Sequence, residues 1–134
     1  MPSRSQTIAA FIATLIAFVT IDAAWIALVA VGQFRAAIGD IMLPEPRLLP
    51  ALAFYFVYTA GLVVLAIRPA ASSGSAAVKG GVLGMTAYAT FDLTNLAIIK
   101  GWTVPLALLD IGWGSFVSAL AATVGFAVAS RQRA

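Results

Sequence analysis

Long apolar stretches separated by short polar segments dominate the chain. Four ranges are free or nearly free of charge: residues 7–32, 48–67, 80–99 and 102–130. A membrane-spanning helix needs about 20 apolar residues, so each range is long enough to cross a bilayer once. Turn-forming or small residues separate the ranges at Gly32 and in the segments LPEPR (43–47), RPAASSGSAAVK (68–79) and KGW (100–102). The pattern predicts an all-α, polytopic membrane protein: an antiparallel bundle of four transmembrane helices that forms one membrane domain over residues 1–134.

The composition supports a membrane protein and excludes several kinds of chemistry. Hydrophobic residues make up 62% of the chain and charged residues only 10%, with a mean hydropathy of +1.01, whereas soluble domains carry about 25% charged residues. Cysteine and histidine are both absent, which excludes disulfides, thiolate or imidazole metal ligands, and catalysis by either side chain. The net charge is only +3 and the basic residues are scattered, so the sequence does not predict nucleic-acid binding.

The basic residues between the apolar ranges predict an orientation. With four spans, the side that holds both termini collects Arg4, Arg68, Lys79, Arg131 and Arg133. The opposite side holds Arg35, Arg47 and Lys100, together with Asp40 and Glu45. Because cytoplasmic loops carry an excess of Lys and Arg, both termini are predicted to be cytoplasmic.

Three aspartates lie inside the apolar ranges, and each begins a four-residue motif. The motifs are DAAW (22–25), DLTN (92–95) and DIGW (110–113). Residues i and i+3 share one face of a helix, so each carboxylate has a partner one turn away. An aspartate near the bilayer centre costs at least ~2.5–3.5 kcal/mol, so all three are expected to face the interior of the bundle.

The depths of these aspartates predict one shared polar site. Counted from the outer ends of their spans, the three carboxylates lie roughly 12–15 Å deep at ~1.5 Å rise per residue, and the two tyrosines of the second span fall at a similar depth. The candidate ligand-binding residues are Asp22, Trp25, Tyr55, Tyr58, Asp92, Asn95, Asp110 and Trp113.

Two states of the buried carboxyls are compatible with the sequence. Either some are protonated and serve only as structural hydrogen-bond donors, or a cation lies among them. Oxygen ligands suit a hard ion such as Na⁺, Mg²⁺ or Ca²⁺ and do not suit zinc. No cofactor motif is present, and no residue is assigned a catalytic role.

Glycines at helical spacing predict where helices meet. Gly80 and Gly84 lie four residues apart in the third range, and Gly112 and Gly114 lie in the fourth. Small residues at such spacing allow helix backbones to approach closely, so all four are expected at helix–helix contacts.

Three strings carry a resemblance to a known family: IDAAWI (21–26), AYATFDLTNLA (87–97) and LLDIGWG (108–114). Together they resemble an uncharacterised family of small bacterial inner-membrane proteins, a domain of unknown function. The resemblance covers nearly the whole chain and implies four membrane helices and a multi-pass location in the bacterial inner membrane. The resemblance also points to lipid metabolism, since members of that family often lie near genes for fatty-acyl modification.

Three functions are compatible with these features. The first is binding or translocation of a cation, a proton or a small polar ligand at the intramembrane site, which implies a homo-oligomer because four helices leave little room for alternating access. The second is a membrane enzyme or accessory factor in lipid acyl-chain modification. The third is a structural subunit of a larger membrane complex.

Overall fold

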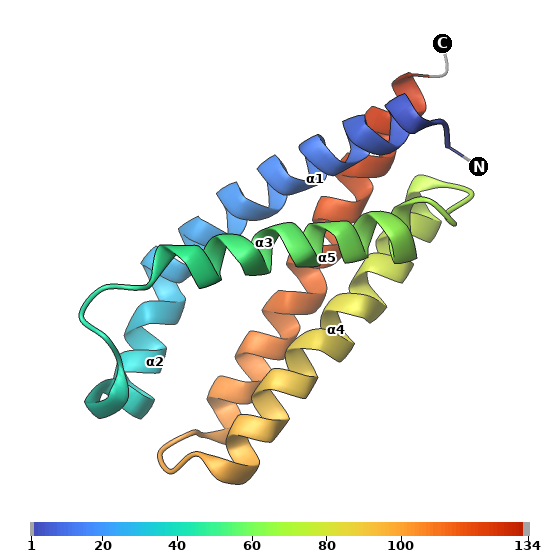
Figure 1. The fold of residues 1–134 in the computed structure, drawn as a ribbon. Coiled ribbons are helices and arrows are strands. Elements are labelled where there is room, and N and C mark those ends of the chain that lie inside the picture. Colours follow the sequence, from blue (N-terminus) through green and yellow to red (C-terminus); the bar gives the residue numbers. More distant parts are fainter. Residues whose placement is uncertain (1, 133–134) are drawn as a thin grey trace.

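The computed structural model describes residues 2–132, and within them the chain is helical, without strands (Figure 1). The elements are α1 (Arg4–Trp25), a π-helical segment (Ile26–Ala30), α2 (Val31–Ile38), a 3₁₀ turn (Gly39–Ile41), α3 (Leu48–Leu62), a second π-helical segment (Val63–Ile67), α4 (Ser73–Ile98) and α5 (Val104–Arg131). The all-α prediction is confirmed.

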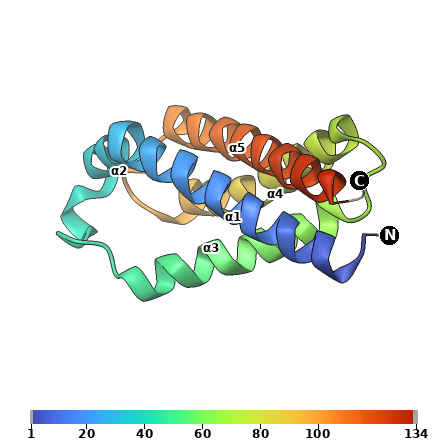
Figure 2. The ribbon, with the colours of Figure 1, turned by 90° about the horizontal axis from the view of Figure 1, so that it is seen from above.

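These elements form four long helical rods in an up-and-down arrangement. The first rod runs from α1 through α2, and the second from α3 through Val63–Ile67. Helix α1 begins and α5 ends at the same end of the bundle, here called the terminal end (Figure 1), where the Gln6 side chain donates to the Ala129 carbonyl at 3.3 Å. The opposite end, here called the distal end, holds the 42–47 segment and the turn between α4 and α5. Seen from above, α1 and α5 lie side by side (Figure 2).

Helix boundaries follow local capping chemistry. Ser3 and Gln6 form a capping box at the start of α1, and the Ser72 hydroxyl accepts from the Ser75 backbone N–H at 3.1 Å before α4. Thr103 caps α5 in the same way, accepting from the Leu106 N–H at 3.2 Å. Such caps satisfy backbone donors that a helix start leaves without partners.

Two predicted boundaries are wrong. Gly32 does not end the first helix, because a single glycine costs a helix only ~1 kcal/mol, and the first rod continues as far as Ile41. The segment 68–79 is not a loop throughout, since α4 begins at Ser73. The breaks at 43–47 and around 100–102 lie where the sequence predicts them.

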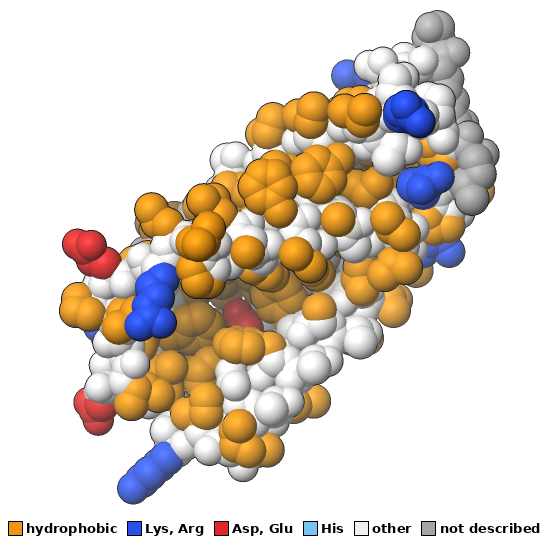
Figure 3. All heavy atoms as spheres, viewed as in Figure 1, with side chains coloured by type: hydrophobic (Ala, Val, Ile, Leu, Met, Phe, Trp, Pro, Cys, Tyr) orange, Lys and Arg blue, Asp and Glu red, His pale blue; other side chains and the backbone are white. Residues whose placement is uncertain are grey.

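The surface of the bundle is apolar between two charged ends. Large hydrophobic side chains point outward along the rods, among them Leu28 (83% exposed) and Leu49 (80% exposed). Figure 3 shows orange side chains over the body of the molecule and most of the blue and red ones at its ends. A soluble protein would not expose so large an apolar surface, whereas a lipid bilayer covers it.

Within the described residues, three helices are long and apolar enough to cross a membrane: Arg4–Ile41, Leu48–Ile67 and Val104–Arg131. Helix α4 is long enough at 26 residues but is not among the three. It contains many glycines, serines and threonines, which lower its hydropathy and bring it close to α5.

Close packing of small residues joins α4 to α5, the most extensive helix contact in the bundle. A Cβ atom on Gly80 would lie 2.7 Å from the Ala122 Cβ and 2.8 Å from the Ser118 carbonyl oxygen. Gly84 and Gly114 are equally enclosed, so three of the four predicted glycine contacts are present. The prediction for Gly112 is wrong: no atom lies within 4 Å of its Cβ position, because it faces away from α4.

Candidate functional site

A cavity of about 360 Å³ lies in the distal half of the bundle. Its lining comes from all four rods and consists of Asp22, Trp25, Ile26, Ala30, Phe34, Phe54, Tyr58, Ala87, Tyr88, Phe91 and Asp110. The volume lies within the range of small-molecule sites. In Figure 3 the surface is hollowed on the viewed face, with a red acidic group visible inside the hollow. The cavity therefore opens sideways, toward the apolar surface of the bundle.

The cavity exists because α3 leaves the bundle as it approaches the distal end. Only the π-helical segment that follows α3 packs closely on α4, while α3 itself packs mainly on α1. The other π-helical segment contributes Ile26 and Ala30 to the wall. A π-helical turn inserts an extra residue into a helix and is frequent at functional sites.

Asp22 is fixed by two hydrogen bonds from different helices. Its Oδ2 accepts from the Tyr55 hydroxyl at 2.8 Å, and its Oδ1 accepts from the Trp113 indole N–H at 3.0 Å. The side chain is 5% exposed. This arrangement joins α1, α3 and α5 and satisfies both carboxylate oxygens within the protein.

The tryptophans of the two D-x-x-W motifs stack on each other. The rings of Trp25 and Trp113 have centroids 4.4 Å apart and an interplanar angle of 4°. Trp25 lines the cavity, and its indole N–H is buried without an acceptor among the described residues. The similar motifs thus meet in space, but only Trp113 donates to the aspartate of the other motif.

Asp92 and Asp110 form a carboxyl–carboxyl pair between α4 and α5. The two carboxyls are close enough to interact electrostatically, but no hydrogen bond joins them among the described residues. Asp92 is completely buried, and neither of its oxygens accepts from an N–H or O–H group of the described residues. The Trp102 indole lies near Asp92, and its buried N–H also has no hydrogen-bond partner among the described residues. Asp110 faces the cavity and Asp92 lies behind it.

The remaining predicted residues divide between the cavity and its surroundings. Tyr58 lines the cavity, and its hydroxyl is 2.6 Å from the Ser118 Oγ. Tyr55 reaches the site through its bond to Asp22 but lies outside the cavity lining. Asn95 is half-buried and does not line the cavity. The DLTN motif therefore contributes its carboxyl to the site but not its amide.

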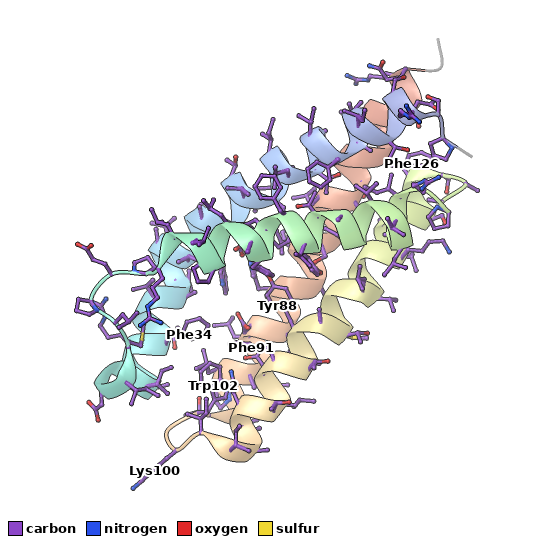
Figure 4. The ribbon with its side chains drawn as sticks, viewed as in Figure 1. Phe34, Tyr88, Phe91, Lys100, Trp102 and Phe126 are labelled. Atoms are coloured by element: carbon purple, nitrogen blue, oxygen red, sulfur yellow. The ribbon has the colours of Figure 1, made fainter. Side chains whose placement is uncertain are left out.

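Five aromatic residues at or near the site were not predicted from the sequence: Phe34, Phe54, Tyr88, Phe91 and Trp102. In Figure 4, Phe34, Phe91 and Trp102 lie in the space between α2 and the α4–α5 hairpin, whereas Lys100 points away from the bundle. Tyr88 lies nearer α3, with its ring centroid 6.3 Å from that of Tyr58. The Trp102 ring lies 5.4 Å from Phe34 and 5.7 Å from Phe91, centroid to centroid. Tyr88 precedes Asp92 by four residues, a spacing that places it on the same helix face, so the sequence did contain a signal for it.

The expected convergence of all three aspartates is only partly visible in the geometry. Asp22 and Asp110 line one cavity and Asp92 faces Asp110. Among residues 2–132, however, no group of three acidic side chains is close enough to hold a metal ion. The site is thus a fixed aspartate beside a carboxyl pair, within an aromatic wall.

Comparison with known proteins extends this description. The comparisons with curated proteins and with solved structures gave no match. The model of one family, described as "Predicted membrane protein (DUF2177)", matches residues 7–127, a range that contains the three aspartates and every residue that lines the cavity. The chain belongs to this family of membrane proteins of unknown function, as the sequence resemblance predicted.

Proposed function

We propose that this protein binds an amphiphilic cation, which enters from the lipid and places its charged group beside Asp110. The observation that carries the proposal is an aromatic, sideways-opening cavity with the Asp110 carboxyl in its wall and the Asp92 carboxyl, which has no hydrogen-bond donor, next to it.

All four rods are proposed to cross the bilayer, with both termini in the cytoplasm of a bacterial cell and the distal end outside. Four basic residues lie toward the terminal end: Arg4, Arg68, Lys79 and Arg131. Because cytoplasmic loops carry an excess of Lys and Arg, this pattern favours that end as cytoplasmic. Arg133, also assigned to that side, lies outside the described residues. Helix α4 packs antiparallel along α5, so it crosses wherever α5 crosses.

The cavity walls favour an apolar body with a positive charge. Six aromatic rings line the cavity, from Trp25, Phe34, Phe54, Tyr58, Tyr88 and Phe91. Aromatic faces attract cations, most strongly where water is excluded. No Lys or Arg belongs to the lining, so a phosphate or carboxylate group would meet only acids of its own sign.

The carboxyls at the cavity differ in what they can offer a ligand. Asp22 already accepts two hydrogen bonds. Asp110 faces the cavity beside Asp92, whose oxygens lack donors. A buried carboxylate without a counter-charge is costly, and an ammonium group beside Asp110 would supply that counter-charge.

Three other functions account for fewer of the features of the cavity: lipid acyl-chain modification, translocation and a structural role. A role in lipid acyl-chain modification shares the sideways opening, and Asp110 would then serve as an acid or base. Translocation implies a second copy of the chain, because four helices leave little room for alternating access. A structural role leaves the cavity unused.

The experiment measures binding of decyltrimethylammonium to the protein in zwitterionic lipid nanodiscs by titration calorimetry, with empty nanodiscs as the background. Wild type is expected to bind saturably, and Asp110→Asn is expected to weaken binding at least tenfold. Asp40→Asn removes an exposed acid outside the cavity and should bind as wild type does. Absence of saturable binding, or equal binding by Asp110→Asn, would refute the proposal.

A further inference from the structure

We propose that the terminal end of the bundle binds an anionic phospholipid, with the lipid phosphate between Arg68 and Lys79 and the acyl chains on the apolar surface next to them. This site is separate from the aromatic cavity and does not depend on the proposed function.

Charge of a single sign gathers at the terminal end. The described residues there include four cations, whereas all five acidic residues of the chain lie in the distal half of the bundle or at its distal end: Asp22, Asp40, Glu45, Asp92 and Asp110. In the view of Figure 3 the charged groups at the terminal end are blue, and the red groups lie at the distal end and in the hollow. An anion that approaches the terminal end is therefore attracted by every charged side chain described there.

Arg68 is held where the second π-helical segment meets α4. That segment, Val63–Ile67, packs closely on α4 and also contacts α5, and Ile67 at its end is almost completely buried. The Arg68 side chain is half-buried, and its Nε is enclosed without a hydrogen-bond acceptor among the described residues. Enclosure at Nε restricts the guanidinium to one position, so an external anion must bind through the two Nη groups. Guanidinium N–H groups are well suited to phosphate oxygens.

Lys79 lies on the side of α4 that faces the same segment. It precedes Leu83 by four residues, a spacing that places both on one face of the helix. Leu83 packs against the buried cluster that includes Val63 and Ile67. The Lys79 side chain itself is exposed. Arg68 and Lys79 thus border one seam of the bundle, one cation from each side.

Exposed apolar side chains lie one turn closer to the middle of the bundle than either cation. Val64 and Leu65 precede Arg68, Val82 follows Lys79, and all three are more than half exposed. Because the two helices run in opposite directions, both sets lie on the inner side of the cations. A phosphate held by Arg68 and Lys79 therefore places acyl chains on this apolar surface. A free phosphate ion would leave the surface unused, which favours a lipid as the partner.

The test measures how added lipid stabilises the full chain in a neutral detergent. The rise of the melting temperature with the concentration of phosphatidylglycerol, or of phosphatidylcholine with the same acyl chains, gives an apparent affinity for each lipid. Wild type is expected to prefer phosphatidylglycerol, because a net negative headgroup suits two cations. Arg68→Gln and Lys79→Gln should each weaken its binding about fivefold. Arg47→Gln removes an exposed cation from the distal end and should bind as wild type does.

Several outcomes would refute the site. Equal affinity of wild type for the two lipids would do so, as would unchanged binding in Lys79→Gln, an exposed position that tests the site even if Arg68→Gln does not fold. A loss in Arg47→Gln as large as the loss in Lys79→Gln would show only an effect of net charge. Displacement of phosphatidylglycerol by inorganic phosphate, but not by chloride at the same ionic strength, would assign the two cations to a free anion instead of a lipid.

Discussion

The indole rings of Trp25 and Trp113 lie parallel and in van der Waals contact, one from each D-x-x-W motif. They connect α1 to α5 next to the Asp22 carboxylate, which accepts a hydrogen bond from the Trp113 N–H. Since Trp25 also forms part of the cavity wall, this stack links the packing of two helices to the shape of the site.

Separating the stacked pair should be visible both in spectra and in stability. Two parallel indoles at this distance are expected to give an exciton couplet in circular dichroism, and Trp25→Phe should abolish it. The loss of the stacked contact should lower the free energy of unfolding by about 0.5–1.5 kcal/mol. Trp102→Phe serves as the control, because Trp102 packs with Phe34 and Phe91 instead. A couplet that survives in Trp25→Phe would contradict the stack.

The hydrogen bond from Tyr55 to Asp22 should couple the two residues energetically. Hydrogen bonds between membrane helices contribute about 0.6 kcal/mol on average and up to about 1.7 kcal/mol. Tyr55→Phe and Asp22→Asn are each expected to lower stability, and the double variant should lose less than the sum of the two. Reversible unfolding in detergent measures all four proteins of this cycle. Strict additivity would show that the bond contributes nothing.

Close packing of α4 on α5 should make Gly84 intolerant of a side chain. A Cβ atom there would lie 2.5 Å from the Ser118 Oγ and 2.6 Å from its Cβ, so Gly84→Leu would force the helices apart. Overpacking typically costs about 1–3 kcal/mol, and the expected loss is at the upper end because helix backbone is also in the way. Thermal unfolding in detergent measures the loss.

Gly112→Leu provides the matched control for that change. Gly112 lies on α5, the helix that Gly84 of α4 packs against, but there is open space at the Gly112 Cβ position. Leucine there would face lipid and should leave the melting temperature unchanged or slightly raised. Equal destabilisation by the two variants would mean that α4 and α5 do not pack as described.

The proposed topology predicts which fusions are active. A fluorescent protein fused to the C-terminus should fluoresce, because it folds in the cytoplasm. An alkaline phosphatase inserted at residues 43–47 should be active, because that segment faces outward. The reverse pattern would contradict the orientation while leaving the bundle intact.

The sequence alone determined that this is a helical membrane protein, and it determined where most of the helices lie along the chain. Stretches of about 20 apolar residues can only be buried as helices in a bilayer, and helix caps such as Thr103 act through residues within one turn. The cost of a carboxylate in lipid was also sufficient to predict that Asp22, Asp92 and Asp110 face inward, and all three are buried.

Tertiary structure decided which of these groups meet. Side chains one turn apart share a face only approximately, and the rotation of each helix about its axis depends on contacts with its neighbours. The close approach at Gly80 and Gly84 sets that rotation for α4. It turns Asp92 toward Asp110 and leaves Asn95 outside the cavity.

The aromatic wall depends on contacts that no local pattern encodes. Phe34 reaches Trp102 because the first rod continues through Gly32 to the distal end, and helix continuation there is governed by packing more than by propensity. Which residues form helices followed from the hydrophobicity of the chain, whereas the site follows from the angles and rotations at which small residues allow those helices to pack.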